Sequence, residues 1–476
     1  MEPCALKFVA EACAGELLVG APEAEVRRVC TDSRAAQPGD LFVALTGERF
    51  DGHAFWAEAR RRGAVAWVAA RARLPAPPLS GAVIAVENPR QALGRLAASY
   101  RRRLGTPAVA VGGSNGKTTT KELLAAVLRQ KLPTLWSAAS FNNDIGVPLT
   151  LLELERRHAV AVIEVGTNHP GELEPLVGLV APRWGVLTSI GREHLEFFGD
   201  VAGVAAEEGV LAERLPADGT LFLSGDGRWV EPIARRTSAR VVRIGTGAGC
   251  DWRVQGVRVS ETGTTFSVEG PVAALAGEYR VNLVGRHQAL NALFAIAVGA
   301  EFGLDHVAIQ RGLGECAGPK MRLQVWMANG VRVLDDAYNA NADSTLAALQ
   351  TLGELPCAGR RLAVLGDMAE LGAHSTAAHT EAGRRAAELQ LDRLVAVGRM
   401  AGVTAAAARA AGLRAVAEYV EVESAVAEVC GWAQPGDTVL LKASRVMRLE
   451  RVGEALRRGA SGGARGPKTQ ERASGS

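Results

Sequence analysis

The apolar and polar positions change their pattern along the chain. Before about residue 88, short apolar runs such as DLFVALTG, AVAWVAA and AVIAV are separated by small and polar residues, which predicts a domain of short strands. From Ala108 onward, the apolar runs AVAVGG, AVAVIEVG and WGVLTSIG alternate with helical stretches. This alternation is typical of a parallel sheet covered by helices.

Two later changes of pattern complete the predicted organisation. Residues 251–285 alternate apolar and polar positions and contain turn residues, so we expect a small antiparallel meander within the second domain. After about residue 316 the alternation of strands and helices resumes, with VRVLDDAY, RLAVLGD, RLVAVG and DTVLLKAS. We therefore expect an α/β protein with domains at residues 1–88, 89–316 and 317–458. Residues 459–476 contain almost no apolar side chains and are expected to be disordered.

Composition mainly excludes classes of partner and of targeting segment. The formal net charge is +3 and 22% of the residues are charged, a balance that gives no argument for a nucleic-acid or membrane partner. No charge-free stretch approaches a membrane-spanning length, and the first 20 residues lack the basic start of a signal peptide. The seven cysteines are scattered, odd in number and never in a CxxC pair, so we expect a cytoplasmic protein with reduced thiols.

The strongest chemical signal is the run AVAVGGSNGKTTTKELLAAVL at residues 108–128. A strand enters a glycine-rich turn and then a helix, an arrangement that surrounds phosphates with backbone N–H groups and a helix N-terminus. Lys117 supplies charge to the outer phosphates, and the Thr118 hydroxyl is suited to Mg²⁺. Gly112 lies one residue closer to Gly116 than in the common phosphate-binding loop. The alternative is an ordinary strand-to-helix turn that contains a lysine.

Two further strand ends carry side chains that suit a metal. Glu164 ends the apolar run AVAVIE, and His194 follows the run WGVLTSIG. The carboxyl ends of parallel strands form the ligand-binding edge of such a sheet, so we expect both side chains near the phosphates, with Glu164 holding Mg²⁺. The alternatives are a surface strand end for Glu164 and a structural role for His194.

Seven motifs occur in order: GGSNGKTTTKE, FNNDIGVPLTLL, EVGTNHPGEL, REHLEFFGDVAGVA, GRHQALNALFAIAVG, DDAYNANADSTLAAL and GDMAELG. This ordered set resembles the Mur ligases of bacterial cell-wall synthesis, whose phosphate loop has the same shortened spacing. The resemblance covers about residues 25 to 455 and is strongest to the members that add a dipeptide. It implies a UDP-sugar domain, a central ATPase with a phosphate-binding loop, and a C-terminal Rossmann-like domain.

The resemblance also implies a reaction. ATP would phosphorylate the terminal carboxylate of a UDP-N-acetylmuramoyl-tripeptide, and the amine of D-alanyl-D-alanine would attack the resulting acyl phosphate. Phosphorylation turns a poor acyl donor into one with a good leaving group, and cations stabilise the charge in the transition state. ATP and Mg²⁺ are the implied cofactors, and we expect a monomer.

The matching motifs imply which residues of this chain are functional. They also imply that the nucleotide site is shared between the central and C-terminal domains. The residues implied at ATP are Gly113, Ser114, Asn115, Gly116, Lys117, Thr118, Thr119, Asn291, Arg322, Asp336, Tyr338 and Asn339. Those implied at the UDP-sugar are Ser33, Arg34, Thr46, Gly47, Asp51, Asn142 and Asn143. Those implied at the incoming dipeptide are Asp367, Glu370, Leu371 and Arg445. The implied metal residues are Thr118, Glu164, His194 and Glu208, and the implied catalytic residues are Lys117, His194 and Glu208.

Structural readings of the same residues stay open. Asn291, matched to an adenine contact, is also suited to a helix cap or a core-facing position, and Asp336 to a loop or helix cap. The segment around Ser33 is equally compatible with a turn-rich surface. In LKASRVM, Ala443 replaces the glycine of the usual Lys-Gly-Ser-Arg, a change that is strained only where φ is positive.

Glu208 marks a second departure from the family pattern. Many Mur ligases carry a carbamate-modified lysine at the matching position, and its carboxylate-like end helps to hold a second Mg²⁺. Glu208 falls on the apolar face of a predicted helix, whereas Glu207 points about 100° away. An inward-facing carboxylate is costly unless it is paired or binds a metal, so we expect Glu208 to supply the negative charge permanently. A buried ion pair with an arginine is the alternative.

Three other functions compete with this interpretation. Another ligase of the superfamily, such as the third-residue ligase or a folylpolyglutamate-type ligase, is suggested by Asn-Pro-Arg at residues 88–90, although this run precedes the phosphate loop. We interpret it as a linker and helix start. A nucleotide-hydrolysing switch would turn over ATP without a UDP-sugar. A catalytically inactive binding protein would lack Lys117 or the metal residues, which are present.

Overall fold

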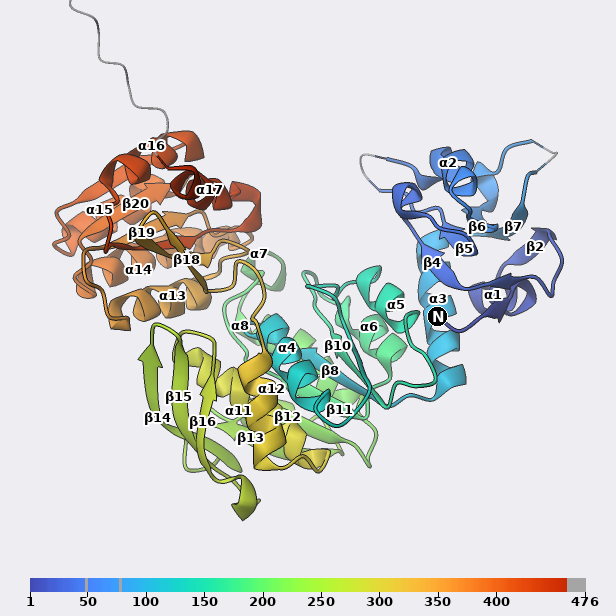
Figure 1. The fold of residues 1–476 in the computed structure, drawn as a ribbon, viewed down its shortest axis with the longest axis horizontal. Helices are drawn as coiled ribbons and strands as arrows, with labels where there is room; N and C mark the ends of the chain where they lie inside the picture. Colours follow the sequence, from blue (N-terminus) through green and yellow to red (C-terminus); the bar gives the residue numbers. More distant parts are fainter. Residues whose placement is uncertain (48–49, 77–78, 460–476) are drawn as a thin grey trace, which may run out of the picture. The chain divides into compact units, whose positions relative to one another are not determined.

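The computed structural model describes residues 1–47, 50–76 and 79–459. The tail expected to be disordered therefore lies, apart from Gly459, outside the described residues. The chain divides into two compact units at Pro319 and Lys320 (Figure 1). Across the described ranges, no helix combines the length and apolar character that crossing a membrane requires.

The first unit begins with a five-stranded sheet in the order β2-β7-β6-β5-β4. Strands β4 to β7 are parallel, and β2 pairs antiparallel with β7. The apolar runs identified in the sequence form the central strands because their side chains are buried. The elements are β2 (Glu16–Val19), β4 (Arg28–Cys30), β5 (Asp40–Val43), β6 (Ala66–Ala70), β7 (Ala82–Val86), α1 (Leu6–Cys13) and α2 (Trp56–Arg61); β1 (Cys4–Ala5) pairs with β3 (Glu25–Val26).

Helix α3 (Pro89–Leu104) follows this sheet and starts at the Asn-Pro-Arg run. The Asn88 side chain accepts hydrogen bonds from the N–H groups of Arg90 and Gln91, at 2.9 and 3.2 Å, and Pro89 occupies the first turn, where its missing N–H costs nothing. Gly105 ends the helix with φ +70°. The interpretation of this run as a helix start is confirmed.

The central nine-stranded sheet has the order β16-β15-β14-β13-β12-β11-β8-β10-β9. Strands β8 to β14 pair in parallel, and β14, β15 and β16 form the expected antiparallel meander at one edge. The strands are β8 (Ala108–Gly112), β9 (Thr134–Trp136), β10 (Val160–Glu164), β11 (Trp184–Leu187), β12 (Thr220–Ser224), β13 (Arg240–Gly245), β14 (Trp252–Ser260), β15 (Gly263–Glu269) and β16 (Gly277–Val281).

Helices cover both faces of this sheet. Val109 and Val111 of β8 face one layer, while Ala108 and Ala110 face the other, so a continuous apolar run serves two cores. The first layer contains α4 (Lys117–Leu128), α11 (His287–Glu301) and α12 (His306–Glu315); the second contains α5 (Gly146–Leu151), α6 (Leu173–Val180), α9 (Val210–Glu213) and α10 (Val230–Ala234).

The second unit is a six-stranded sheet in the order β17-β18-β22-β19-β20-β21. All pairings are parallel except β17 with β18, which agrees with the expected Rossmann-like arrangement. The strands are β17 (Gln324–Ala328), β18 (Val331–Asp336), β19 (Arg361–Gly366), β20 (Arg393–Val397), β21 (Val416–Tyr419) and β22 (Thr438–Lys442). The helices are α13 (Ala342–Glu354), α14 (Ser375–Glu388), α15 (Ala401–Ala410), α16 (Val422–Trp432) and α17 (Glu450–Arg458).

Candidate active site

The glycine-rich loop lies at the carboxyl end of β8 and leads into α4. Gly113 and Gly116 have φ values of +110° and +87°, which L side chains rarely adopt. A Cβ atom on Gly113 would lie 2.5 Å from Thr188 Oγ1, and one on Gly116 would lie 2.5 Å from Asn291 Oδ1. Both positions therefore require glycine, for conformation and for space.

Lys117 is the first residue of α4, and its ammonium group is held inside the loop. Its Nζ contacts the carbonyl oxygens of Gly113 and Ser114 and lies 3.3 Å from Glu193 Oε2. Burial on its own would lower the pKa of Lys117, but the carboxylates of Glu193 and Glu208 outweigh that effect and raise the pKa above its usual value. The side chain is thus positively charged, as phosphate binding requires.

The remaining loop residues are fixed by the segment that follows β11. The Ser114 hydroxyl accepts a 2.8 Å hydrogen bond from Gly191 N–H, and Asn115 N–H donates to Ser189 Oγ at 2.9 Å. Thr119 is buried within α4. The loop is therefore preformed, so little order has to be gained when phosphates bind.

Glu164 ends β10 beside this loop, as the sequence predicts. Its Oε1 accepts hydrogen bonds from Thr118 Oγ1 at 3.1 Å and from Asn142 Nδ2 at 2.8 Å. Its Oε2 is buried and has no hydrogen-bond partner among the described residues. A carboxylate oxygen in that position is costly to bury, and together with a threonine hydroxyl it is the donor type that Mg²⁺ prefers. These residues fit a divalent cation.

His194 occupies the same edge of the sheet, after β11. It precedes α7 (Leu195–Phe198) with a φ of +47°, and its Nε2 lies 3.9 Å from Glu193 Oε2. Glu193 therefore contacts both Lys117 and His194, and the sequence reasoning did not identify it. In the described part of the chain, no three His, Cys, Asp or Glu side chains converge as a metal site, so a cation here would need water or phosphate oxygens as further ligands.

Glu208 is the last residue of α8 (Val201–Glu208) and is fully buried. Its Oε2 accepts a 2.7 Å hydrogen bond from Gly113 N–H, and its Oε1 has no hydrogen-bond partner among the residues described. Burial raises the pKa of Glu208 to about 8, although Lys117 acts in the opposite direction. The predicted inward orientation is confirmed, and the carboxylate bonds to the phosphate loop.

Glu207 faces a different segment, as its helical position predicts, yet it is buried as well. Its two carboxylate oxygens accept hydrogen bonds from the N–H groups of Leu173 and Gly171, both at 2.8 Å. The end of α8 therefore ties down two loops. Glu208 holds the phosphate loop, and Glu207 holds the entry to α6.

Asn291 lies in α11, directly beneath Gly116. Its Oδ1 accepts a 3.3 Å hydrogen bond from Thr120 Oγ1, and its Nδ2 donates to Gln288 Oε1 at 2.9 Å. Both ends of the amide are engaged, so the side chain fastens α11 to α4. This is the core-facing role that the sequence left open, and the adenine contact stays a prediction.

The residues predicted at the UDP-sugar separate into two groups. Thr46, Gly47 and Asp51 follow β5, and Thr46 Oγ1 lies 3.3 Å from Asp51 Oδ1. Ser33 and Arg34 follow the neighbouring parallel strand β4; Ser33 Oγ donates to Glu58 Oε2 at 2.9 Å, and the exposed Arg34 pairs with Asp32 at 2.7 Å. The residues of this first group therefore lie where the parallel strands β4 and β5 end, at the same edge of the N-terminal sheet.

Asn142 and Asn143 form the second group and lie in the central domain. Asn142 bonds to Glu164, as described above, and Asn143 Oδ1 accepts a 2.8 Å hydrogen bond from Gly146 N–H at the start of α5. The structure thus places the Asn142 amide with the phosphate-loop residues. Contacts of either asparagine with the UDP-sugar or its peptide stay predictions.

The C-terminal nucleotide residues cluster at the ends of β18 and β22. The guanidinium of Arg322 lies 4.3 Å from the centroid of the Tyr338 ring. Asp336 Oδ2 forms a 2.7 Å ion pair with Lys442 Nζ, which also donates to Asn339 O at 2.7 Å. Lys442 was not among the predicted residues, although it ends a strand within the motif LKASR. Its burial lowers the pKa, against the opposing effect of Asp336.

The residues predicted at the incoming dipeptide lie in two loops, after β19 and after β22. Asp367 accepts 2.9 Å hydrogen bonds from the N–H groups of Arg399 and Met400, ahead of α15. Leu371 is buried, and Arg445 pairs with Glu450 of α17 at 3.1 Å. Glu370 has a φ of +60°. Their role at the dipeptide stays a prediction.

Ser444 nevertheless connects the two loops that carry these residues. Its Oγ accepts a 2.8 Å hydrogen bond from Ala369 N–H, and its own N–H donates to Asp367 O at 3.0 Å. Ala443 is buried, is not among the residues with positive φ, and packs against Gly366. The replacement of glycine by Ala443 is therefore unstrained.

His379 of α14 anchors the loop at Met368. Its Nε2 accepts a 3.1 Å hydrogen bond from Met368 N–H while its Nδ1 lies 2.8 Å from Ser375 O, and burial lowers its pKa. As the pH falls, His379 therefore becomes protonated in the unfolded chain before it does so in the folded chain. The contribution of His379 to the free energy of unfolding is therefore fully present above a pH of about 6.5, the ordinary histidine pKa. This contribution is lost as the pH falls towards the lowered pKa of His379 in the folded chain.

We expect His379→Gln to flatten this acid-side loss of stability. The measurement is thermal unfolding of the full chain between a pH of about 7.5 and about 5, around the histidine pKa. His374→Gln, at an exposed position before α14, is the control and should keep the wild-type slope. Equal slopes for wild type and His379→Gln would show that this histidine does not govern the acid response.

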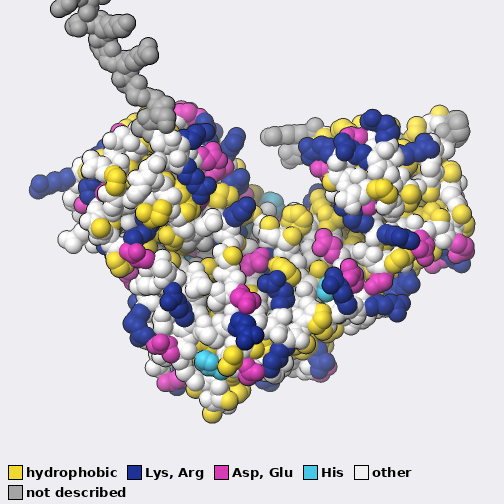
Figure 2. All heavy atoms as spheres, viewed as in Figure 1, with side chains coloured by type: hydrophobic (Ala, Val, Ile, Leu, Met, Phe, Trp, Pro, Cys, Tyr) yellow, Lys and Arg dark blue, Asp and Glu magenta, His cyan; other side chains and the backbone are white. Residues whose placement is uncertain are grey.

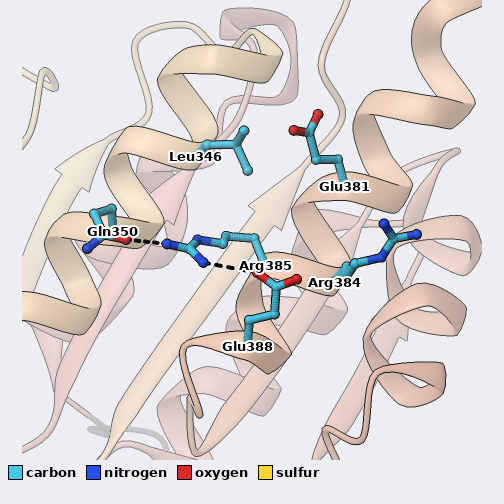
Figure 3. Close-up of a pocket in the computed structure, with 6 residues that line it drawn as sticks. All are labelled: Leu346, Gln350, Glu381, Arg384, Arg385 and Glu388. Carbon is cyan, nitrogen blue, oxygen red and sulfur yellow. Dashed lines mark hydrogen bonds and ion pairs between the residues drawn. The ribbon is translucent and has the colours of Figure 1, made fainter.

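A separate groove of about 460 Å³ lies between α13 and α14 (Figure 3). Arg385 crosses it and bonds to Gln350 Oε1 at 2.5 Å and to Glu388 Oε2 at 3.0 Å. Gln350, Arg385 and Glu388 thus already pair with one another across the groove. On the face drawn in Figure 2, basic and acidic side chains are interspersed, which fits the nearly balanced net charge.

Three family models match the chain in succession. They are the Mur ligase family catalytic domain at residues 25–101, the Mur ligase middle domain at residues 111–299, and the Mur ligase glutamate ligase domain at residues 321–445. The UDP-N-acetylmuramoyl-tripeptide–D-alanyl-D-alanine ligase of Bacillus subtilis is 36% identical over 430 residues, covering 90% of this chain and 92% of the relative. The chain belongs to the Mur ligase family. The ligase of the same name from Escherichia coli is 38% identical over 435 residues, covering 90% of this chain and 93% of that protein.

Solved Mur ligase structures share the fold. MurF from Acinetobacter baumannii superposes with a TM-score of 0.87 at 31% identity and covers 96% of this chain and 99% of its own. The MurF ligase of Thermotoga maritima in complex with ADP has a TM-score of 0.76 at 27% identity and covers 91% and 97%. The expected α/β fold and the resemblance to Mur ligases are confirmed. As a Mur ligase, the chain is an ATP-dependent enzyme that forms peptide bonds.

Proposed function

We propose that this Mur ligase joins D-alanyl-D-alanine to a UDP-N-acetylmuramoyl-tripeptide through an acyl phosphate, in the synthesis of peptidoglycan precursors. The names of the two relatives support the substrates. The observation that carries the chemistry is the central site, where Lys117 lies inside the glycine-rich loop and Glu164 presents a buried oxygen that has no partner in the described part of the chain. We expect a cytoplasmic monomer. Residues 1–88 are proposed as the UDP-sugar domain, residues 89–316 as the central ATPase, and residues 317–458 as the Rossmann-like domain.

The chemistry proceeds in two displacements. A carboxylate oxygen of the tripeptide attacks the γ-phosphorus of ATP, and ADP leaves. The dipeptide amine then attacks the acyl carbon, the tetrahedral intermediate collapses, and inorganic phosphate leaves while the amine loses its proton. Lys117 balances negative charge on the phosphates throughout, and the N–H groups in the first turn of α4, at Lys117–Thr119, orient them.

Four residues are proposed to hold Mg²⁺: Thr118 and Glu164, with His194 and Glu208 towards a second ion. Bound there, the ion would neutralise phosphate charge and polarise the transferred phosphoryl group. Among the chain's own residues, Asn142 orients Glu164 by its 2.8 Å hydrogen bond, and Glu208 fixes Gly113. The strand-edge group around Ser33 and Asp51 is proposed for the UDP-sugar.

The first experiment measures phosphate release from ATP with each substrate present separately and with both together. Release should require the UDP-N-acetylmuramoyl-tripeptide and D-alanyl-D-alanine at the same time, because the acyl phosphate forms only on the tripeptide and turns over only with an acceptor. Fast release with ATP and no other substrate would support a nucleotide-hydrolysing switch instead. Release with a single amino acid in place of the dipeptide would indicate another ligase of the superfamily.

A further inference from the structure

Lys121 is a buried charge that the site described so far does not use. It lies in α4, three residues after Thr118, and its side chain has no solvent-exposed surface. Lysine is almost never fully buried unless it is paired. Its ammonium group donates to Ser137 O at 2.7 Å, to Ala139 O at 2.8 Å and to Glu122 Oε1 at 2.5 Å. All three donors of the ammonium are therefore satisfied.

Two of these acceptors belong to the segment that follows β9, residues 137–142. Ala139 has a φ of +46°, a conformation that costs a residue with a Cβ about 1 kcal/mol or more. A local bend of this kind persists only where surrounding contacts hold it. The ammonium of Lys121 supplies such contacts, since it binds the carbonyl of Ala139 and that of Ser137 at the same time.

The same segment is attached at its other side to Glu164. Ser137 Oγ accepts a 3.0 Å hydrogen bond from Glu164 N–H, and Asn142 O accepts one of 3.0 Å from Gly166 N–H. Asn142 Nδ2 then reaches Glu164 Oε1 at 2.8 Å, which leaves Oε2 without a partner among the described residues. A continuous set of hydrogen bonds thus runs from α4, through residues 137–142, to the carboxylate at the end of β10.

We propose that Lys121 is a positioning residue for the cation site. It holds residues 137–142 in the shape that keeps the Asn142 amide on one oxygen of Glu164 and leaves the other oxygen open to Mg²⁺. The proposal rests on the proposed function for its biological meaning. The test measures cation binding and not ligation, however, so a failure of this proposal can be distinguished from a failure of the ligase assignment.

An apolar side chain could fill the space of Lys121, but it would leave the buried carbonyl group of Ser137 and the more exposed one of Ala139 without this donor. That loss destabilises the bent segment specifically, because these two hydrogen bonds tie it to α4. Lys117 and Thr118 precede the change in the same helix, so nucleotide contacts made by the loop are expected to survive it.

The test compares Lys121→Met with Lys131→Met, a matched substitution at a half-exposed lysine just after α4 that pairs with Asp305 on the surface. Binding of Mn²⁺ to the ADP complex of the full chain is measured by electron paramagnetic resonance. ADP affinity is measured separately in the presence of a chelator. We expect Lys121→Met to weaken Mn²⁺ binding by about 10- to 100-fold, the usual effect of removing support from a metal ligand, with little change in ADP affinity. Lys131→Met should match the wild type in both.

Asn142→Ala provides a second variant that decides the question if Lys121→Met does not fold. Because Lys121 is proposed to act through Asn142, this substitution should reproduce the selective loss of Mn²⁺ affinity. The proposal is overturned if either folded variant binds Mn²⁺ as the wild type does, or if ADP and Mn²⁺ affinities fall by the same factor. A wild-type chain that binds Mn²⁺ but joins no peptides would refute the ligase assignment and leave the role of Lys121 standing.

Discussion

Lys117→Ala is expected to abolish ligation while the chain remains folded. The ammonium lies inside the phosphate loop, on the carbonyls of Gly113 and Ser114, and no second lysine occupies that loop. It opposes the multiple negative charges of ATP and of the transferred phosphoryl group. Removing one such preorganised charge costs a few kcal/mol of transition-state stabilisation, which corresponds to a loss of about 10²-fold or more in rate.

The control for this variant is Lys131→Ala, at the exposed end of the same helical region. Phosphate release with both substrates and the thermal unfolding temperature are measured for each. We expect an inactive, folded Lys117→Ala and an active Lys131→Ala. Near-normal turnover in Lys117→Ala would mean that this loop is not where phosphoryl transfer occurs.

Glu208→Ala is expected to have the second-largest effect. The substitution removes the acceptor of the Gly113 N–H. It also removes one of the buried carboxyl groups that raise the pKa of Lys117. We expect turnover to fall by about 10²-fold, the scale for one preorganised electrostatic contact, and the Mg²⁺ requirement to rise. Because the carboxyl group is part of the side chain and needs no carbon dioxide to form, activity should not depend on added bicarbonate.

Two further substitutions separate charge from hydrogen bonding at this position. Glu208→Gln keeps an oxygen for Gly113 but cannot ionise when a cation binds, so the raised Mg²⁺ requirement should persist in it. Glu207→Gln alters the neighbouring carboxylate, which holds Gly171 and Leu173, and should lower thermal stability more than Mg²⁺ affinity. Normal activity and Mg²⁺ dependence in Glu208→Ala would disprove the idea that this glutamate replaces a modified lysine.

Local pattern was enough to predict the strand-to-helix turn at Lys117 and the strand end at Glu164. In both cases the sequence position determines the place on the sheet, because parallel strands end at a common edge. The meander at residues 251–285 was predictable for a similar reason, since its alternation is itself the signal. The short edge strands β17 and β21 were missed, because each offers only a brief apolar run.

Partners contributed by distant segments could not be predicted. Glu193 and Lys442 act through contacts with Lys117 and Asp336, each more than 70 residues away in the chain. Lys121 looked like an ordinary helix residue, since nothing in TTTKE shows that two carbonyls after β9 would meet it. Asn142 was predicted for the substrate, yet its amide lies on Glu164. Periodicity shows which face a side chain takes, but not which partner the rest of the fold places there.

The central claim is that the tripeptide carboxylate passes through an acyl phosphate. It is tested most directly with a UDP-N-acetylmuramoyl-tripeptide whose terminal carboxylate carries oxygen-18, incubated with the chain, ATP, Mg²⁺ and D-alanyl-D-alanine. Mass spectrometry of the products should find one labelled oxygen in the released phosphate and the other in the new peptide bond. Ligated product accompanied by unlabelled phosphate, or phosphate formed without ligated product, would contradict the account.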